Sequence, residues 1–112
     1  IAFNTLGRFI LIVENNGAIA NMQDDAMVEV VCELGINGPR PMSVGNIPQF
    51  YLGLLVQQVS CEKLLVDAYY EHSYQKALEA FTLNRLINDA KVARKILDAL
   101  IEANKGMWPE LK

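Results

Sequence analysis

The sequence has few of the residues from which metal and redox sites are built. It has one histidine, His72, and two cysteines, Cys32 and Cys61, and it contains neither a Cys-x-x-Cys nor a His-x-x-x-His spacing. Protein metal sites draw their ligands from clusters of such residues, so we predict no metal site in this chain. The two cysteines are expected to be buried, reduced thiols, with a disulfide as the alternative.

Other absences narrow the function further. No glycine-rich phosphate-binding motif occurs, which excludes the common nucleotide-binding turns. The ten Lys and Arg residues are scattered and the net charge is −3, so the basic stripe of a nucleic-acid-binding protein is missing. Residues 41–61 carry no charge, but Pro, Gly, Ser, Asn and Gln interrupt them, which argues against a membrane span. The chain opens without an initiator Met or a signal-like segment, and we interpret it as a piece of a longer protein.

The hydrophobic pattern of the first half predicts three strands. Residues 8–13 include five consecutive apolar side chains, which is typical of a strand covered on both faces. Residues 27–34 alternate between apolar and polar, as in a strand with one wet face. Asn37-Gly38 marks a hairpin turn, and residues 40–44 are predicted to return as an edge strand because Pro39 and Pro41 lack a donor.

The second half predicts three helices. The first covers about residues 48–71, with apolar residues on more than one face, so we expect it in the core, in a subunit interface, or in both. The second runs from Ser73 or Tyr74 to about residue 83, with Ser73 as N-cap. The third, capped by Asn88 or Asp89, runs to about residue 105. Gly106 would follow its end as the C′ residue, and Met107 and Trp108 would pack back on the core. Strands followed by helices predict a single α+β domain over residues 1–112.

The loop at residues 14–21 is the one candidate binding feature. Asn15, Asn16 and Asn21 place three amides around Gly17 at the end of the first strand. Amides donate and accept hydrogen bonds, so they suit sugar hydroxyls and phosphate oxygens, and loops at strand ends commonly carry binding residues. From the residues alone, the loop is either such a site or an ordinary turn. No group of acids, bases or nucleophiles forms a catalytic constellation, and His72 is interpreted as a helix-end residue that suits the helix dipole.

The uncharged segment also predicts an interface. It offers more apolar side chains than a unit of this size covers, and exposed apolar patches usually mark contacts. We expect the helix face around Phe50, Leu54 and Gln57 to meet another subunit or a domain outside this chain.

Several stretches resemble the C-terminal region of family 4 glycosidases, and within that family the 6-phospho-α-glucosidases. The matching stretches are residues 13–21, 27–30, 37–39, 44–50, 57–64 and 102–111. They share one register and cover nearly the whole chain. Val31, where the family usually has proline, is a departure from the pattern.

The resemblance implies a fold like the C-terminal domain of lactate and malate dehydrogenases, within an enzyme about four times longer. That enzyme would be a cytoplasmic homo-oligomer with an N-terminal NAD-binding domain, and it would hydrolyse phosphorylated disaccharides such as maltose 6′-phosphate. Its redox-elimination chemistry uses NAD and a divalent metal, often manganese, held by a Cys and a His, and so differs from the two-carboxylate scheme of ordinary glycosidases.

The resemblance places that chemistry outside this chain. We therefore expect no catalytic, NAD-binding or metal-binding residue here and no activity from the chain alone, with Asn15, Asn16, Gly17 and Asn21 lining the substrate pocket of the intact enzyme. The alternatives are the C-terminal domain of a 6-phospho-β-glucosidase and a stand-alone dimerisation module without catalysis.

Overall fold

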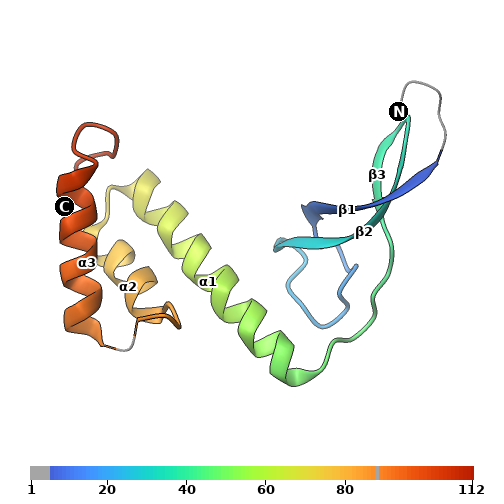
Figure 1. The fold of residues 1–112 in the computed structure, drawn as a ribbon, viewed down its shortest axis with the longest axis horizontal. Coiled ribbons are helices and arrows are strands. Elements are labelled where there is room, and N and C mark those ends of the chain that lie inside the picture. The colour runs from blue at the N-terminus through green and yellow to red at the C-terminus, as the bar shows by residue number, and fades with distance from the viewer. Residues whose placement is uncertain (1–5, 88) are drawn as a thin grey trace. The chain divides into compact units, whose positions relative to one another are not determined.

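The computed structural model describes residues 6–87 and 89–112. Three strands precede three helices (Figure 1), and the predicted α+β class is confirmed. The elements are β1 (Gly7–Glu14), β2 (Met27–Gly35), β3 (Gly38–Pro41), α1 (Gln49–Glu71), α2 (Tyr74–Leu83) and α3 (Ala90–Ala103).

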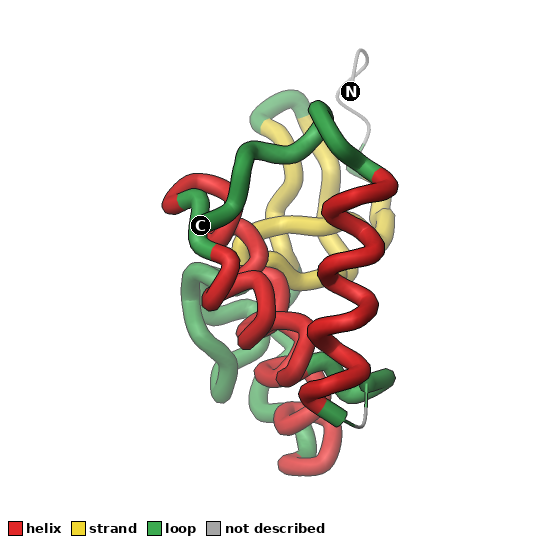
Figure 2. Tube along the Cα trace, turned by 90° about the vertical axis from the view of Figure 1, so that its left-hand side faces the viewer, coloured by secondary structure: helices red, strands yellow, loops and turns green. Residues whose placement is uncertain are grey.

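The chain divides into two compact units, residues 1–54 and 55–112. The first holds the three strands (Figure 2) and the beginning of α1, and the second holds the rest of α1 with α2 and α3. The single domain expected from the sequence stays a prediction.

The strands form an antiparallel sheet in the order β1-β2-β3. The alternation predicted for β2 is confirmed, because Val28, Val30 and Cys32 are buried while Glu29 is exposed. All eight residues of β1 pair with β2, from Gly7↔Leu34 to Glu14↔Met27. The loop that joins the two strands, residues 15–26, therefore leaves and re-enters the sheet at the same end of the hairpin.

The third strand is shorter and earlier than predicted. It pairs over Gly38–Pro41 rather than 40–44. After Pro41 the chain leaves β2: the Met42 amide still donates to Val31 O (2.9 Å), but the Val44 amide donates to Ala18 O (2.7 Å). The returning segment is therefore diverted to the β1–β2 loop, a long-range contact that local sequence pattern does not contain.

The prediction that β1 is covered on both faces is wrong for the described chain. Phe9, Ile10 and Ile12 are exposed, Ile12 by 70% of its surface. In the β1–β2 register, Ile10 and Ile12 lie opposite Val31 and Glu29 on one face of the sheet. No layer from the described residues buries that face.

The second unit packs its helices around a small apolar core. The fully buried residues Ala68, Ala77 and Leu97 come from α1, α2 and α3, and α2 lies beside α3 (Figure 1). The predicted caps are confirmed: Ser73 Oγ accepts from the Lys76 amide, and Asp89 Oδ1 accepts from the Lys91 and Val92 amides. Asn88, the alternative cap, lies outside the described residues.

Three details of the helices differ from the predictions. Only Val59, Cys61 and Ala68 of α1 are buried, so within the described chain this helix is not covered on several faces. Helix α3 ends at Ala103 with Asn104 as C-cap, so the C′ position falls on Lys105, and Gly106 (φ +84°), the predicted C′ residue, lies one residue beyond it. Met107 is 82% exposed rather than packed, whereas Trp108 is half-buried.

Candidate substrate-binding loop

The loop between β1 and β2, residues 15–26, is organised around one buried side chain. Asn15 is completely buried. Its Nδ2 lies 3.0 Å from Ile19 O, 3.2 Å from Met22 O and 3.1 Å from Gln23 O, and its Oδ1 accepts from the Ile19 amide at 2.7 Å. The carboxamide that the sequence offered to a substrate is therefore used within the loop.

The backbone of the loop closes on itself around the same residue. The Asn15 amide donates to Ala26 O (2.8 Å), the Asn16 amide donates to Asp24 O (2.9 Å), and Asn15 O accepts from the Ala18 amide (2.7 Å). Four apolar residues of the loop are buried as well: Ala18, Ile19, Met22 and Ala26. The loop thus has an interior of its own, as compact surface loops do.

The amide of Asn21 is also used within the chain. Its Nδ2 donates to Ile47 O (2.9 Å) and its Oδ1 accepts from the Ile47 amide (3.0 Å), so the side chain pairs with the backbone as a neighbouring strand would. The Ala20 amide donates to Gly45 O (2.9 Å) beside a parallel bridge between Ile19 and Gly45. The segment before α1 is thereby fastened to the loop.

Asn16 and Gly17 form a turn, and the side-chain carboxamide of Asn16 is the third of the three that the sequence places in this loop. Both have positive φ, +42° and +83°, and both are exposed. Asparagine and glycine are the residues that adopt this left-handed conformation most readily. Of the three asparagines named by the sequence, Asn16 alone has an exposed carboxamide without a side-chain hydrogen bond in the described structure, and it is the one that can meet a ligand.

Sequence reasoning missed the structural role of Asn15. The signal lay in the loop itself, where small and apolar residues alternate with asparagines; a purely solvent-facing turn would not need Ile19 and Met22. Such apolar residues indicate a loop with an interior, and a buried asparagine is a usual way to satisfy its backbone carbonyls.

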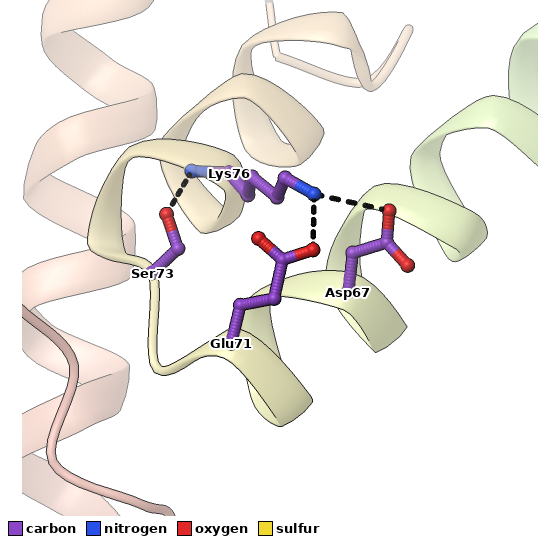
Figure 3. A network of polar contacts seen from close by, with 4 residues as sticks. All are labelled: Asp67, Glu71, Ser73 and Lys76. Carbon is purple, nitrogen blue, oxygen red and sulfur yellow. Dashed lines mark hydrogen bonds and ion pairs between the residues drawn. The ribbon is translucent and has the colours of Figure 1, made fainter.

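The polar groups of the second unit tie its helices together. Lys76 Nζ contacts Glu71 Oε1 at 2.6 Å and Asp67 Oδ2 at 3.3 Å, joining α2 to α1, and its amide is bound by Ser73 (Figure 3). The hydrogen bond to Glu71 is the main cause that raises the pKa of the Lys76 ammonium. These groups are paired with one another and leave no reactive centre.

His72 marks the end of α1, as expected. It has a φ of +56°, its Nδ1 lies 3.3 Å from Glu110 O, and its carbonyl accepts from the Lys112 amide at 2.8 Å. Since the Tyr74 amide also donates to Lys112 O (3.0 Å), this corner pairs with the C-terminal segment. The arrangement is that of a structural residue.

The second unit contains an apolar pocket of about 420 Å³. Its lining includes Cys61, Leu65, Phe81, Leu86 and Ile87. Burial raises the pKa of the Cys61 thiol, which keeps it protonated and unreactive. Cys32 is buried too, and both cysteines are free thiols, as predicted.

Residues 1–87 match the family 4 glycosyl hydrolase C-terminal domain. The chain belongs to this family. A maltose-6′-phosphate glucosidase of Bacillus subtilis is 59% identical over 111 residues, which is 99% of this chain and 25% of that protein. A probable 6-phospho-β-glucosidase of the same organism is 43% identical over 96 residues, 86% of this chain and 22% of that protein.

A solved structure extends the likeness to three dimensions. The 6-phospho-α-glucosidase from gut microorganisms, in complex with NAD and Mn²⁺, is 86% identical with a TM-score of 0.93, over 99% of this chain and 25% of that one. The chain spans about a quarter of the length of the relatives it matches.

Among residues 6–87 and 89–112, no three His, Cys, Asp or Glu side chains gather where they could hold a metal ion. None of the three helices in this part of the chain combines the length and apolar character that a membrane span requires.

The predicted interface residues lie on α1, and the prediction about them stays open. Phe50 is 70% exposed and packs its ring edge against Tyr51. Leu54 is half-buried. Gln57 Nε2 donates to Leu83 O at 2.9 Å, so its amide already has a partner within the second unit.

Proposed function

We propose that this chain is the C-terminal domain of an NAD- and divalent-metal-dependent 6-phospho-α-glucosidase. The enzyme would act in the cytoplasm as a homo-oligomer and hydrolyse phosphorylated disaccharides such as maltose 6′-phosphate, with Mn²⁺ as the metal. The observation that carries the proposal is 86% identity over 99% of the chain to a 6-phospho-α-glucosidase that binds NAD and Mn²⁺. The α anomer is favoured because identity falls from 59% to 43% between the two Bacillus subtilis relatives.

The exposed side of the sheet supports membership of a larger protein. Ile10, Ile12, Met27 and Val31 share one face, and between 41% and 70% of the surface of each is exposed. The same face carries the charged residues Arg8, Glu14, Glu29 and Glu33. Exposed apolar side chains gathered among charged ones in this way are typical of a contact with another protein surface. Phe50, exposed on α1, supports a subunit or domain contact in the same way.

The contribution of this domain to the reaction is to shape the substrate pocket. Asn16, exposed on a turn whose neighbours are fixed by Asn15, can donate to and accept from a sugar hydroxyl or a phosphate oxygen. The hydride and proton steps belong to NAD, metal and base outside this chain.

The test is hydrolysis by the full-length enzyme that contains this chain, assayed with NAD and Mn²⁺. We expect cleavage of maltose 6′-phosphate and little cleavage of cellobiose 6′-phosphate. The reverse preference would establish the 6-phospho-β-glucosidase alternative, and activity in neither case would overturn the proposal.

Asn16→Ala in the same enzyme tests the pocket. Loss of a hydrogen bond to a charged phosphate costs about 1.5–3 kcal/mol, and 1.4 kcal/mol is a factor of ten, so kcat/KM should fall at least about tenfold. The melting temperature should fall only slightly, because the side chain is exposed and the strain of alanine at φ +42° falls on one loop residue. The matched control is Asn37→Ala, an exposed asparagine in the β2–β3 turn. Equal kinetics for the two variants would show that the loop is only a turn.

A further inference from the structure

Asn15 stands apart among the polar residues of the described chain. It is the only polar or charged side chain there that is buried, at 0% exposure. A buried amide without partners is costly, yet here every buried side-chain nitrogen and oxygen of the described residues has a partner. The burial of Asn15 is therefore compensated by the hydrogen bonds that its carboxamide makes to the loop backbone.

That network requires an amide and no other side chain of similar size. The Nδ2 group faces three carbonyl oxygens at 3.0–3.2 Å, while Oδ1 faces the Ile19 N–H at 2.7 Å. An aspartate is isosteric, but it would direct a carboxylate oxygen at those three carbonyls and would offer no donor. The bonds hold residues 19–23 against the start of the loop.

The neighbouring residue is the one displayed to solvent. Asn16 has φ +42° and its amide donates to Asp24 O. Non-glycine residues stay in such sparsely populated conformations only where the surroundings fix them. The Asn15 backbone next to Asn16 is fixed, since its amide donates to Ala26 O and its carbonyl accepts from the Ala18 amide. The Asn15 side chain keeps these partners in place by binding the loop backbone at Ile19, Met22 and Gln23.

We propose that Asn15 is a positioning residue, which sets Asn16 in a fixed orientation on the pocket side of the loop and does not itself touch the substrate. The inference rests on the proposed function, since it needs Asn16 to face a substrate. It assigns different roles to two adjacent asparagines that the sequence presents as equivalent.

The test uses Asn15→Asp, Asn16→Ala and the double variant in the full-length enzyme. Amide hydrogen exchange reads the loop, and steady-state kinetics with maltose 6′-phosphate reads the pocket. In Asn15→Asp we expect exchange of the Ile19 amide to quicken at least about tenfold, while amides in α3 keep their rates. Aspartate retains an acceptor for the Ile19 amide, but its carboxylate loses the donor to the carbonyls of Ile19, Met22 and Gln23 and repels them, which opens the loop. The matched control is Asn37→Asp, which introduces the same charge in an exposed turn and should change neither readout.

Steady-state kinetics should show that Asn15 affects hydrolysis by orienting Asn16. We expect Asn15→Asp to lower kcat/KM about as much as Asn16→Ala, with the same division between KM and kcat. The double variant should be no worse than Asn15→Asp alone, because the two changes remove one interaction. Multiplicative losses in the double variant, or an unchanged Ile19 exchange rate, would overturn the proposal.

Failure of the proposed function is recognisable separately. In that case the wild-type enzyme does not cleave maltose 6′-phosphate, whereas the exchange measurement still reports on the loop. If Asn15→Asp does not fold, Asn15→Ser takes its place, since it keeps one donor and one acceptor in a smaller side chain. Loss of the fold in both variants would make Asn15 purely structural and would overturn the positioning role.

Discussion

Each of the two compact units of this chain has its own interior, and the two interiors are of different kinds. In the first, the β1–β2 loop gathers around the Asn15 carboxamide, which hydrogen-bonds four backbone groups, three carbonyls and one amide. In the second, the interior is a few close-packed apolar residues, Ala68, Ala77 and Leu97, and the polar groups lie at the helix ends and on the surface. An apolar interior depends on volume and shape, whereas a polar one depends on the direction of each hydrogen bond.

This difference bears on function. A loop fixed by directional bonds can present one residue, Asn16, in one orientation, which a binding site needs. A helix core built from small alanines allows close helix packing, but it does not hold a polar side chain in a fixed orientation at the surface. The candidate site accordingly lies in the unit whose loop interior holds the buried amide of Asn15 among apolar residues.

The largest expected effect on this comparison comes from Leu97→Ala. Leu97 is 1% exposed at the centre of the helix core, and leucine-to-alanine changes at such sites cost about 2–5 kcal/mol. The free energy of unfolding from urea titration should fall by that amount. Amide exchange should quicken in α2 and α3 and stay unchanged at Ile19.

Leu97→Met is the control, since it conserves volume and should cost less than about 1.5 kcal/mol. If Leu97→Ala speeds exchange equally in the β1–β2 loop, the two units unfold as one. The contrast between their interiors would then not extend to their stability, and the chain would behave as the single domain that the sequence predicts.

The sequence predicts the second unit well because its structure follows local rules. The period of apolar residues places all three helices within a few residues, and Ser73 and Asp89 are caps by residue type and position. The predictions that are wrong in this unit concern solvent exposure, which depends on tertiary packing. Neither the solvent exposure of Met107 nor the wet faces of α1 are visible in a local pattern.

The first unit was predicted in outline, but its organisation was not. The alternation of β2 and the Asn-Gly turn are local signals, and both led to the right hairpin. The diversion of Val44 to Ala18 and the burial of Asn15 are contacts across the loop that no periodicity encodes. The loop that the sequence singles out stays a candidate site, and the amides of Asn15 and Asn21, interpreted from the sequence as binding groups, bind the backbone instead.

The helix caps provide a smaller test within the second unit. Asp89 accepts from two amides, at 2.6 and 3.2 Å, whereas Ser73 accepts from one at 3.3 Å. Replacing a cap by alanine costs about 0.5–2 kcal/mol, and we expect Asp89→Ala near the upper end and Ser73→Ala near the lower. Urea titration measures both, with Asp89→Asn as the control that retains the acceptor. Equal losses would mean that the second bond and the charge at Asp89 contribute little.

The smallest expected effect concerns the bond between α2 and α3 made by Tyr74, whose hydroxyl donates to Asp98 Oδ1 at 2.7 Å. This hydrogen bond, followed by burial and by the charge of Asp98, raises the pKa of the Tyr74 phenol. The ordinary tyrosine pKa is about 10, so above that pH the unfolded chain loses this proton more readily than the folded one. The stability from the bond is then fully present below pH 10 or so and is lost as the pH rises through the folded-state pKa. Tyr74→Phe should lower stability slightly at neutral pH and flatten the alkaline decline, whereas Tyr70→Phe, at a side chain that is 77% exposed, should change neither. Urea titration between pH 8 and 11 measures how the free energy of unfolding declines with pH. If it declines with the same slope in Tyr74→Phe and in the wild type, the α2–α3 contact depends on apolar packing alone.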